Sequence, residues 1–340
     1  MKNLRSFYLI LLGLVGCFNS VHNDIPPNQI AMKSDSREGT AIFYYMKGQL
    51  HESEGQLGDA VKAYSYVTKY YLETEVAPKT FHTYGRLLLK QNKLEEAFEK
   101  LRFITKNYVN YEAYGQVIME EFEIACQLMK RFEEKLNWKV LSFFKDPEPI
   151  IKCFQHIIGM APYSVNAPKS LFYIAQLEYK YGDKAKAIES LDRLINDYPG
   201  SEYLPDAYLL QAEIYLSFVN SAQNDQGMTK KAIDCYEDFF VLFGVQETKF
   251  PEKMQQAKSG LEYARNLYAE SRLVLGDFYL YRRHYPQGAL VFYNEARLIA
   301  PVSKISNIAD SRMDFINCGK MIPANWADFC FGKVIYKPVK

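Results

Sequence analysis

The side chains that could carry out chemistry are spread along the chain without forming a catalytic pattern. Five histidines stand far apart, and adjacent glutamates such as Glu95-Glu96 and Glu120-Glu121 have the spacing of solvated helix faces. The sequence contains no glycine-rich phosphate loop, no Gly-x-Ser-x-Gly nucleophile elbow and no His-Glu-x-x-His zinc helix. We therefore predict a protein that is not an enzyme and that uses no cofactor or metal.

One side chain, the thiol of Cys17, has a chemical role that its context predicts. Lys2 and Arg5 precede an apolar run from Phe7 to Val15, and a small residue stands directly before the cysteine. This arrangement resembles the lipobox of bacterial lipoproteins, in which the cysteine thiol accepts diacylglycerol. We expect residues 1–16 to be a signal peptide and Cys17 to be the lipidated N-terminus; an ordinary signal peptide or a buried first helix are the alternatives. Phe18, where Asp would resemble an inner-membrane retention signal, favours the outer membrane.

Composition limits the remaining classes of protein. Lys and Arg number 41 against 40 Asp and Glu, which gives no electrostatic reason to expect a nucleic-acid partner. Hydrophobic residues make up 48% of the chain, too many for a disordered protein. After the first segment, no stretch approaches the roughly 18 apolar residues of a membrane span. Residues 17–38, rich in Asn, Ser, Asp and Pro, read as the lipidated cysteine and a flexible tether.

A helix-turn-helix pattern recurs through residues 39–301. A small residue precedes an alanine by 12 positions, an aromatic residue or leucine follows the alanine by four, and a proline follows it by 12. Ala175, Ala187, Leu191 and Pro199 illustrate the spacing. Small residues let two helices approach closely, the larger side chain fills the space one turn further on, and proline ends the second helix.

This pattern resembles the tetratricopeptide repeat, whose period is about 34 residues. The resemblance implies an all-α fold, a right-handed superhelical solenoid of about six helix-turn-helix repeats with a C-terminal capping segment. The third repeat is divided by a break near residues 146–149, and the fifth carries an insert at residues 220–227. Residues 302–340 form the cap or tail, in which Ile305 to Ile316 is the expected capping helix.

The first helices of such repeats line a groove that binds extended or helical peptides. The sides of the first helices that should face the groove carry three groups of candidate partner-binding residues. The alternative is that these residues are ordinary solvated surface. A second candidate contact is the pair Arg282 and Arg283. The groove candidates are Tyr45, Gln49 and Glu52, then His82, Arg86 and Lys90, then Phe172, Gln176 and Tyr179.

The cysteines other than Cys17 divide into two groups. Cys126, Cys153 and Cys235 lie on apolar helix faces, where we expect a small buried hydrophobe. Cys318 and Cys330 are close in the tail, and a disulfide between them stays open because spacing alone does not fix geometry. An active site in the tail, built around these two cysteines and Asp328, is the alternative to a non-catalytic protein.

Two segments of the fourth repeat carry a more specific resemblance. Residues 166–175, Asn-Ala-Pro-Lys-Ser-Leu-Phe-Tyr-Ile-Ala, and residues 187–201, which begin Ala-Ile-Glu and end Tyr-Pro-Gly-Ser, are typical of BamD-like lipoproteins. That family belongs to the outer-membrane β-barrel assembly machinery. The resemblance implies a lipid-anchored scaffold on the periplasmic face of the outer membrane. Its implied partners are the periplasmic domains of a BamA-like barrel-forming subunit, other assembly lipoproteins and unfolded outer-membrane proteins. A scaffold in a cell-envelope or division complex is the alternative.

The aromatic content, 15% with 27 Tyr and 22 Phe, needs an explanation of its own. In a repeat array each unit touches only its neighbours, so large rings must supply the burial between units. We expect this packing role for Tyr44, Tyr64, Phe81, Phe154, Tyr208, Tyr215, Tyr236, Tyr279 and Tyr293.

Overall fold

A computed structural model of the chain describes residues 36–136, 146–219, 221, 226–246 and 249–318. The expected signal peptide, Cys17, most of the tether, Asp328 and Cys330 lie outside the described residues, as do most of the insert at 220–227 and the tail from 319. The described part contains 13 α-helices and no strand, and the helices follow one another as packed pairs. The predicted all-α repeat architecture is confirmed. None of these helices combines the length and the hydropathy of a membrane span.

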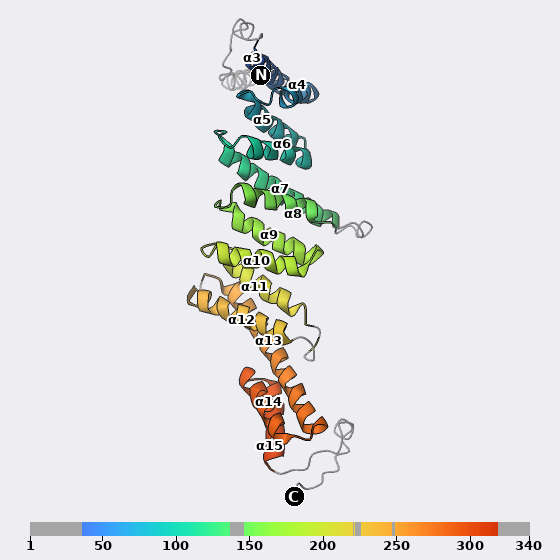
Figure 1. The fold of residues 1–340 in the computed structure, drawn as a ribbon, viewed down its shortest axis with the longest axis vertical. Coiled ribbons are helices and arrows are strands. Elements are labelled where there is room, and N and C mark those ends of the chain that lie inside the picture. Colours follow the sequence, from blue (N-terminus) through green and yellow to red (C-terminus); the bar gives the residue numbers. More distant parts are fainter. Residues whose placement is uncertain (1–35, 137–145, 220, 222–225, 247–248, 319–340) are drawn as a thin grey trace, which may run out of the picture. The chain divides into compact units, whose positions relative to one another are not determined.

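The chain divides into two compact units, residues 1–130 and 131–340. The first unit contains α3 (Arg37–Ser53), α4 (Leu57–Tyr70), α5 (Val76–Lys90), α6 (Leu94–Asn107) and the first part of α7 (Tyr114–Leu136). Helix α3 packs on α4, α5 packs on α6, and α5 also contacts α3 and α4 (Figure 1). The first two predicted repeats correspond to these two pairs.

The second unit begins its described helices with α8 (Glu148–Met160), the second helix of the divided repeat. It continues with the pairs α9 (Asn166–Tyr181) and α10 (Lys184–Asp197), α11 (Leu204–Leu216) and α12 (Gln226–Phe243), and α13 (Pro251–Asp277) and α14 (Pro286–Ile299). A 3-10 turn, η1 (Gly244–Gln246), follows α12, and a π-helical turn, η2 (Phe278–Arg282), follows α13. The capping helix is confirmed as α15 (Lys304–Asn317), which packs on α14 and α13.

Close approach in several helix pairs depends on a glycine that faces a large side chain. A Cβ on Gly48 of α3 would overlap the ring of Tyr64 on α4, and a Cβ on Gly276 of α13 would overlap the ring of Tyr293 on α14. These contacts confirm the predicted match between a small residue and the ring of the next helix. In the last pair the glycine precedes Ala289 by 13 residues instead of 12. The π-helical turn between them holds one more residue per turn than an α-helix and accommodates the extra position.

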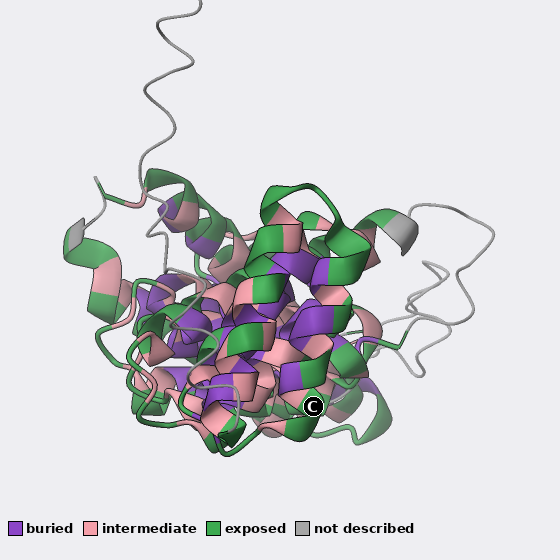
Figure 2. Cartoon of the chain, turned by 90° about the horizontal axis from the view of Figure 1, so that it is seen from above, coloured by how far each residue is buried: buried purple, intermediate pink, exposed green. Residues whose placement is uncertain are grey.

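Buried residues lie on the helix sides that face other helices, and exposed residues lie on the outer sides (Figure 2). Tyr64, Phe154 and Tyr293 are fully buried, and Phe81 and Tyr236 nearly so, which confirms their predicted packing role. Tyr208, Tyr215 and Tyr279 pack at the edge of the second unit's clusters. Among the cysteines expected to be buried, Cys235 is buried, whereas Cys126 and Cys153 are only half-buried.

A buried polar cluster fixes the capping helix to the last pair. Tyr293 donates a hydrogen bond to Asp277 Oδ1 at 2.6 Å, and Arg312 Nε of α15 lies 2.9 Å from the same oxygen. Arg312 also donates from Nη1 to Tyr281 Oη at 2.8 Å. Burial raises the pKa of the Asp277 carboxyl above its ordinary value, against the attraction of Arg312 and the hydrogen bond from Tyr293. One carboxylate therefore joins three helical segments at the C-terminal end of the second unit.

Candidate functional site

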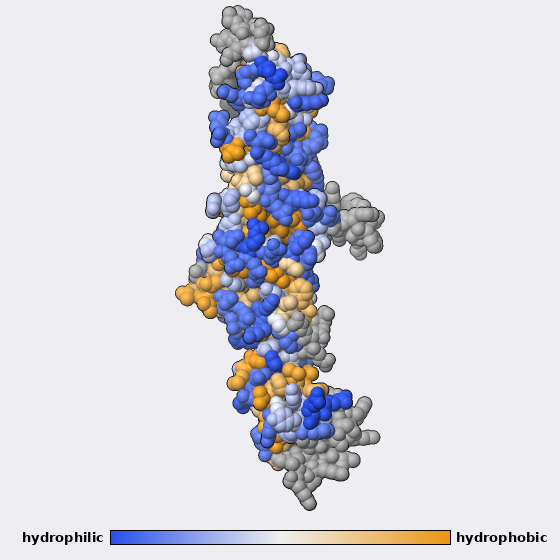
Figure 3. All heavy atoms as spheres, in the orientation of Figure 1, coloured by the Kyte–Doolittle hydropathy of each residue, from blue (hydrophilic) through white to orange (hydrophobic). Residues whose placement is uncertain are grey.

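The predicted groove residues of the first unit lie on one polar face, formed by α3, α5 and the start of α7. Gly48 faces α4 and Gly85 faces α6, and Gln49, Arg86 and Lys90 follow these glycines by one or five residues, about 100–140° further around their helices. Glu52 lies one turn after Gly48 and is close enough to α4 to accept a hydrogen bond from Tyr64. Side chains from α3 and α5 meet there, and α7 supplies the partners of α5. The face of the molecule drawn in Figure 3 has hydrophobic groups scattered among hydrophilic ones over these helices, with no single apolar surface.

The α3–α5 part of this face is joined by an ion pair. Lys90 Nζ lies 2.7 Å from Glu52 Oε1, and Tyr64 donates a hydrogen bond to the other oxygen of Glu52 at 3.2 Å. Gln49 Nε2 donates to Tyr45 Oη at 3.0 Å. Tyr45 is buried, whereas Lys90 remains largely exposed. The exposed ammonium can therefore be approached from solvent while its carboxylate partner is held in place.

The α5–α7 part is a denser cluster centred on Glu120. Arg86 donates to Glu120 Oε1 from Nε at 2.9 Å and from Nη2 at 2.6 Å, and His82 Nε2 lies 2.9 Å from Glu120 Oε2. His82 Nδ1 is 3.1 Å from Tyr111 Oη. His82 is buried, and the side chain of Glu120 is 13% exposed against 50% for Arg86. The guanidinium therefore has one edge on the carboxylate and much of its surface in solvent.

Opposing effects set the ionisation of this cluster. Burial alone would raise the pKa of the Glu120 carboxyl, but the hydrogen bonds from His82 and Arg86 outweigh burial and hold the pKa below its ordinary value. Burial also raises the pKa of Tyr111. Glu120 is thus a fixed anion at neutral pH, and it positions Arg86 at the edge of the polar face.

Sequence reasoning missed Glu120 and Tyr111. It took Glu120-Glu121 for a solvated helix face, but Glu120 is largely buried and Glu121 is fully buried, with Thr105 donating to Glu121 at 2.9 Å. The available signal was the spacing of 34 residues from Arg86 to Glu120, which is one repeat period. The same spacing separates Tyr179 from Glu213.

The third group of candidates lies in the second unit, on α9. Phe172 packs against the ring of Tyr203 with centroids 5.7 Å apart, and Tyr179 Oη donates to Glu213 Oε1 of α11 at 3.1 Å. Gln176 is partly buried between them on the same helix side. Arg282 and Arg283 are exposed at the end of the π-helical turn, well separated in sequence from the groove residues.

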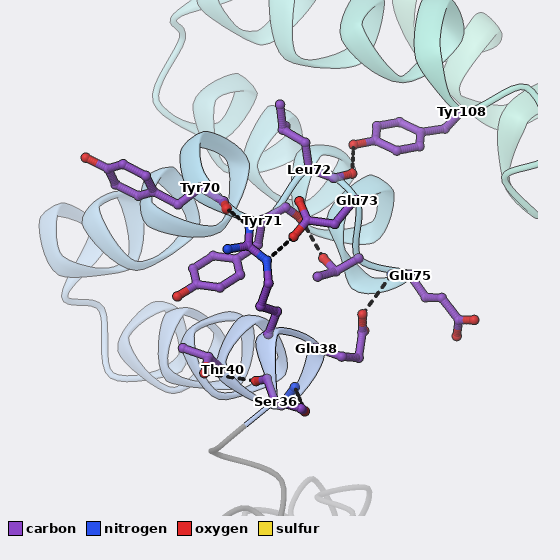
Figure 4. Close-up of polar contacts among 12 residues, drawn as sticks. Ser36, Glu38, Thr40, Tyr70, Tyr71, Leu72, Glu73, Glu75 and Tyr108 are labelled. Carbon is purple, nitrogen blue, oxygen red and sulfur yellow. Dashed lines mark hydrogen bonds and ion pairs between the residues drawn. The ribbon is translucent and has the colours of Figure 1, made fainter.

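A hollow of about 600 Å³ opens beside the polar face of the first unit, between the loop that precedes α5 and the loop that precedes α7. Tyr108 closes one side by donating to the Leu72 carbonyl at 2.6 Å (Figure 4). Tyr111 and Lys79 lie in its lining, and Tyr111 also contacts His82. The hollow and the Glu120 cluster therefore share the side chain of Tyr111.

The donors on the polar face are cations. The described part of the chain has no group of three or more His, Cys, Asp or Glu side chains arranged to hold a metal ion. The exposed cations on the polar face can donate to carboxylates or to peptide carbonyls, and the guanidinium has five N–H donors, of which the bonds to Glu120 use two.

Comparisons with known proteins find the repeat directly. Residues 169–201, in α9 and α10, match the tetratricopeptide repeat family. No curated protein matches the chain. A tetratricopeptide repeat protein from Parabacteroides merdae is similar at 10% identity over 81% of this chain and 97% of that one, with a TM-score of 0.30. The C-terminal part of a repeat-containing protein from Cytophaga hutchinsonii is similar at 16% identity over 83% and 91%, with a TM-score of 0.35. The chain therefore contains a tetratricopeptide repeat within an all-helical array of packed pairs, an arrangement that indicates a protein–protein interaction scaffold.

Proposed function

We propose that the protein is a non-catalytic, lipid-anchored scaffold of the outer-membrane β-barrel assembly machinery. It binds the periplasmic domains of a BamA-like barrel-forming subunit, other assembly lipoproteins or unfolded outer-membrane proteins. The lipobox-like sequence before Cys17 supports the anchor, and residues 166–201 support the family resemblance. The observation that carries the binding role is the polar face of the first unit, where Arg86 and Lys90 are held at the surface by Glu120 and Glu52.

The polar face can exchange its internal ion pairs for contacts with a partner. Exposed ion pairs contribute only about 0–1 kcal/mol, because the Coulomb gain is small in water and holding the side chains costs entropy. Lys90 can therefore leave Glu52 for a partner carboxylate at little cost. Arg86 need not leave Glu120, because its exposed edge still has donors. A segment with acidic side chains or free carbonyls fits this surface.

The α9 face of the second unit offers a different kind of contact. Phe172, Tyr203 and Tyr179 present partly buried rings with a polar rim. Partly exposed aromatic groups are common anchors for partner side chains, since each ring buries a large area at low entropy cost. Unfolded barrel segments, in which aromatic and polar residues alternate, are partners of suitable chemistry.

Crosslinking in intact cells tests the proposal. A photoreactive residue at Arg86 or Arg282 should capture the barrel-forming subunit, identified by mass spectrometry, and the same residue at the exposed Arg193 of α10 serves as the matched control. Recovery of a division or peptidoglycan complex without the barrel-forming subunit would favour the alternative scaffold and reject this one. For the anchor, labelling with a radioactive fatty acid should be lost in Cys17→Ser; persistence of the label would reject lipidation at that cysteine.

A further inference from the structure

A cluster of aromatic rings lies on the first helix pair, outside the core. Tyr44 and Tyr66 have ring centroids 4.2 Å apart, and Tyr66 lies 5.0 Å from Tyr70 and 5.8 Å from Tyr71. Phe43 joins the cluster through Tyr44 at 5.5 Å. We call these five residues the aromatic patch. They come from α3, from α4 and from the residue after α4, so the packing of this one helix pair assembles the patch.

The aromatic patch is not explained by packing inside the repeat. The side of α4 that faces other helices carries Ala60, Ala63, Tyr64 and Val67, all buried. Tyr66 and Tyr70 lie off that stripe and are 37% and 50% exposed, and Phe43 on α3 is 43% exposed. These rings pack on one another and yet remain exposed. Such a cluster of exposed apolar groups indicates a contact surface for a partner outside the helix pair.

Two cations lie over rings of the aromatic patch. Lys69 Nζ lies 5.0 Å from the Tyr70 ring centroid, and the Arg37 guanidinium lies 5.2 Å from that of Tyr71. Arg37 is paired with Glu73, whereas Lys69 is exposed and takes part in no ion pair within the described part of the chain. One cation, Lys69, therefore borders the rings without an ion-pair partner among the described residues.

The aromatic patch also lies where the chain enters the fold. Arg37, the first residue of α3, donates to the Tyr70 carbonyl at 2.8 Å, and Glu38 accepts from the Glu75 N–H at 3.1 Å (Figure 4). These contacts place the start of α3 beside the end of α4. Ser36 stands only 19 positions after Cys17, a span of at most about 65 Å even when fully extended.

We propose that the aromatic patch is a second membrane contact, which rests on the headgroup region of a bilayer that contains anionic phospholipid. Tyrosine suits this region because its ring is apolar and its hydroxyl is polar, and lysines near an anionic surface add electrostatic attraction. The inference rests on the lipid anchor of the proposed function and deepens it. An acyl chain at Cys17 would hold the patch near the bilayer, and the patch would then fix which side of the first unit faces the lipid.

Photocrosslinking to lipid tests the contact. We would place p-benzoylphenylalanine at Phe43 in the acylated full-length chain and reconstitute it in vesicles of phosphatidylethanolamine and phosphatidylglycerol. Tyr163, which is 99% exposed and has no aromatic neighbour within the ring contacts described, is the matched control. Lipid adducts are counted by mass spectrometry, and flotation reports anchoring. We expect several times more lipid adduct at position 43 than at position 163.

A second pair of variants measures the contact without the anchor. In a Cys17→Ser background, Phe43→Ser with Tyr70→Ser should weaken binding to the same vesicles by about tenfold, since two partly exposed rings lose their apolar burial. Tyr163→Ser with Tyr263→Ser removes two exposed rings from the second unit and should leave binding unchanged. Circular dichroism should show the same helix content in both double variants, because every substituted ring is exposed.

The outcomes separate the two proposals. If the chain floats but position 43 gives no more lipid adduct than position 163, the aromatic patch does not contact lipid and the inference is wrong. A second outcome is that no acyl group is found and the chain does not float, while position 43 of the Cys17→Ser chain still crosslinks to lipid. In that case the proposed lipid anchor is wrong and the proposed contact of the aromatic patch with lipid is supported. Crosslinks from position 43 to residues 18–35 or to a second copy in place of lipid would overturn the inference and name the true occupant.

Discussion

The substitution Arg312→Met should loosen the capping helix from the last helix pair. Arg312 faces the buried Asp277, and their side chains are 15% and 9% exposed. Removing one member of a buried pair leaves an uncompensated charge and costs about 3–5 kcal/mol. Tyr293 still donates to Asp277 after the change, so we expect a loss near 3 kcal/mol at pH 7. Methionine keeps the apolar stem that packs beside Tyr281.

The cost should depend on pH. Because burial raises the pKa of Asp277, the folded chain takes up a proton at this carboxyl more readily than the unfolded chain. The contribution of this group to stability is therefore fully present below the unfolded pKa and is lost as the pH rises through the folded pKa. Without Arg312 the folded pKa rises further, so the destabilisation by Arg312→Met should shrink as the pH falls toward the carboxyl range.

Hydrogen exchange measured peptide by peptide is the appropriate assay, since unfolding of a repeat array need not be a single transition. Residues 304–317 should exchange faster in Arg312→Met, and the double variant Asp277→Asn with Arg312→Met should recover most of the protection, because no buried charge is left unpaired. Asp310→Asn, which affects an exposed pair with Arg297 at 3.7 Å, is the control and should cost under about 0.5 kcal/mol. A single variant no worse than this control, or a double variant as unstable as Arg312→Met, would refute the reasoning.

Three further outcomes follow from the same structure. Gly48→Ala should lower the free energy of unfolding in urea by about 1–3 kcal/mol, because the new Cβ meets the Tyr64 ring. Gly58→Ala, whose Cβ meets nothing, should be neutral or stabilising by up to about 1 kcal/mol. Equal effects of the two substitutions would contradict the packing argument. The pKa of Glu120 is lowered in the folded protein, so its contribution to stability is present above the unfolded pKa and is lost as the pH falls through the folded pKa. Glu120→Gln should therefore make the free energy of unfolding depend less on pH in the acid range. An unchanged pH dependence there would reject this role. Burial raises the pKa of the Cys235 thiol to about 12. Alkylation at pH 8, followed by peptide mapping, should therefore be far slower at Cys235 than at the exposed Cys318. Comparable rates would show that the helices around Cys235 open readily to solvent.

The polar face shows where sequence reasoning succeeds and where it stops. Periodicity placed Arg86 and Lys90 on one side of the first helix of the second repeat, and the structure has them on that side. It did not find that Glu120 holds Arg86 or that His82 is buried against Tyr111. A helical period says which residues share a face, but the partner of each comes from a helix one repeat away, where the distance depends on how the helices pack.

Exposure of the aromatic residues was likewise decided by packing. Tyr64 and Tyr66 stand two residues apart on the same helix; the repeat spacing predicted burial for Tyr64 and made no prediction for Tyr66. Tyr64 fills the space above Gly48 and is fully buried, while Tyr66 faces outward and is exposed among other rings. Tyr44, expected to pack between units, instead contacts the exposed rings of Phe43 and Tyr66.

The sequence by itself determined that this chain is a series of helix pairs. Small residues, aromatic residues and helix-ending prolines recur at the spacings that the packing of two neighbouring helices requires. It also determined the predictions about Cys17, which depend on a short contiguous motif. Tertiary structure alone decided which carboxylates are buried, which cations remain available on the polar face, and which rings form the aromatic patch. These properties depend on burial and on distances between residues far apart in the chain, so they cannot be predicted from a local sequence pattern.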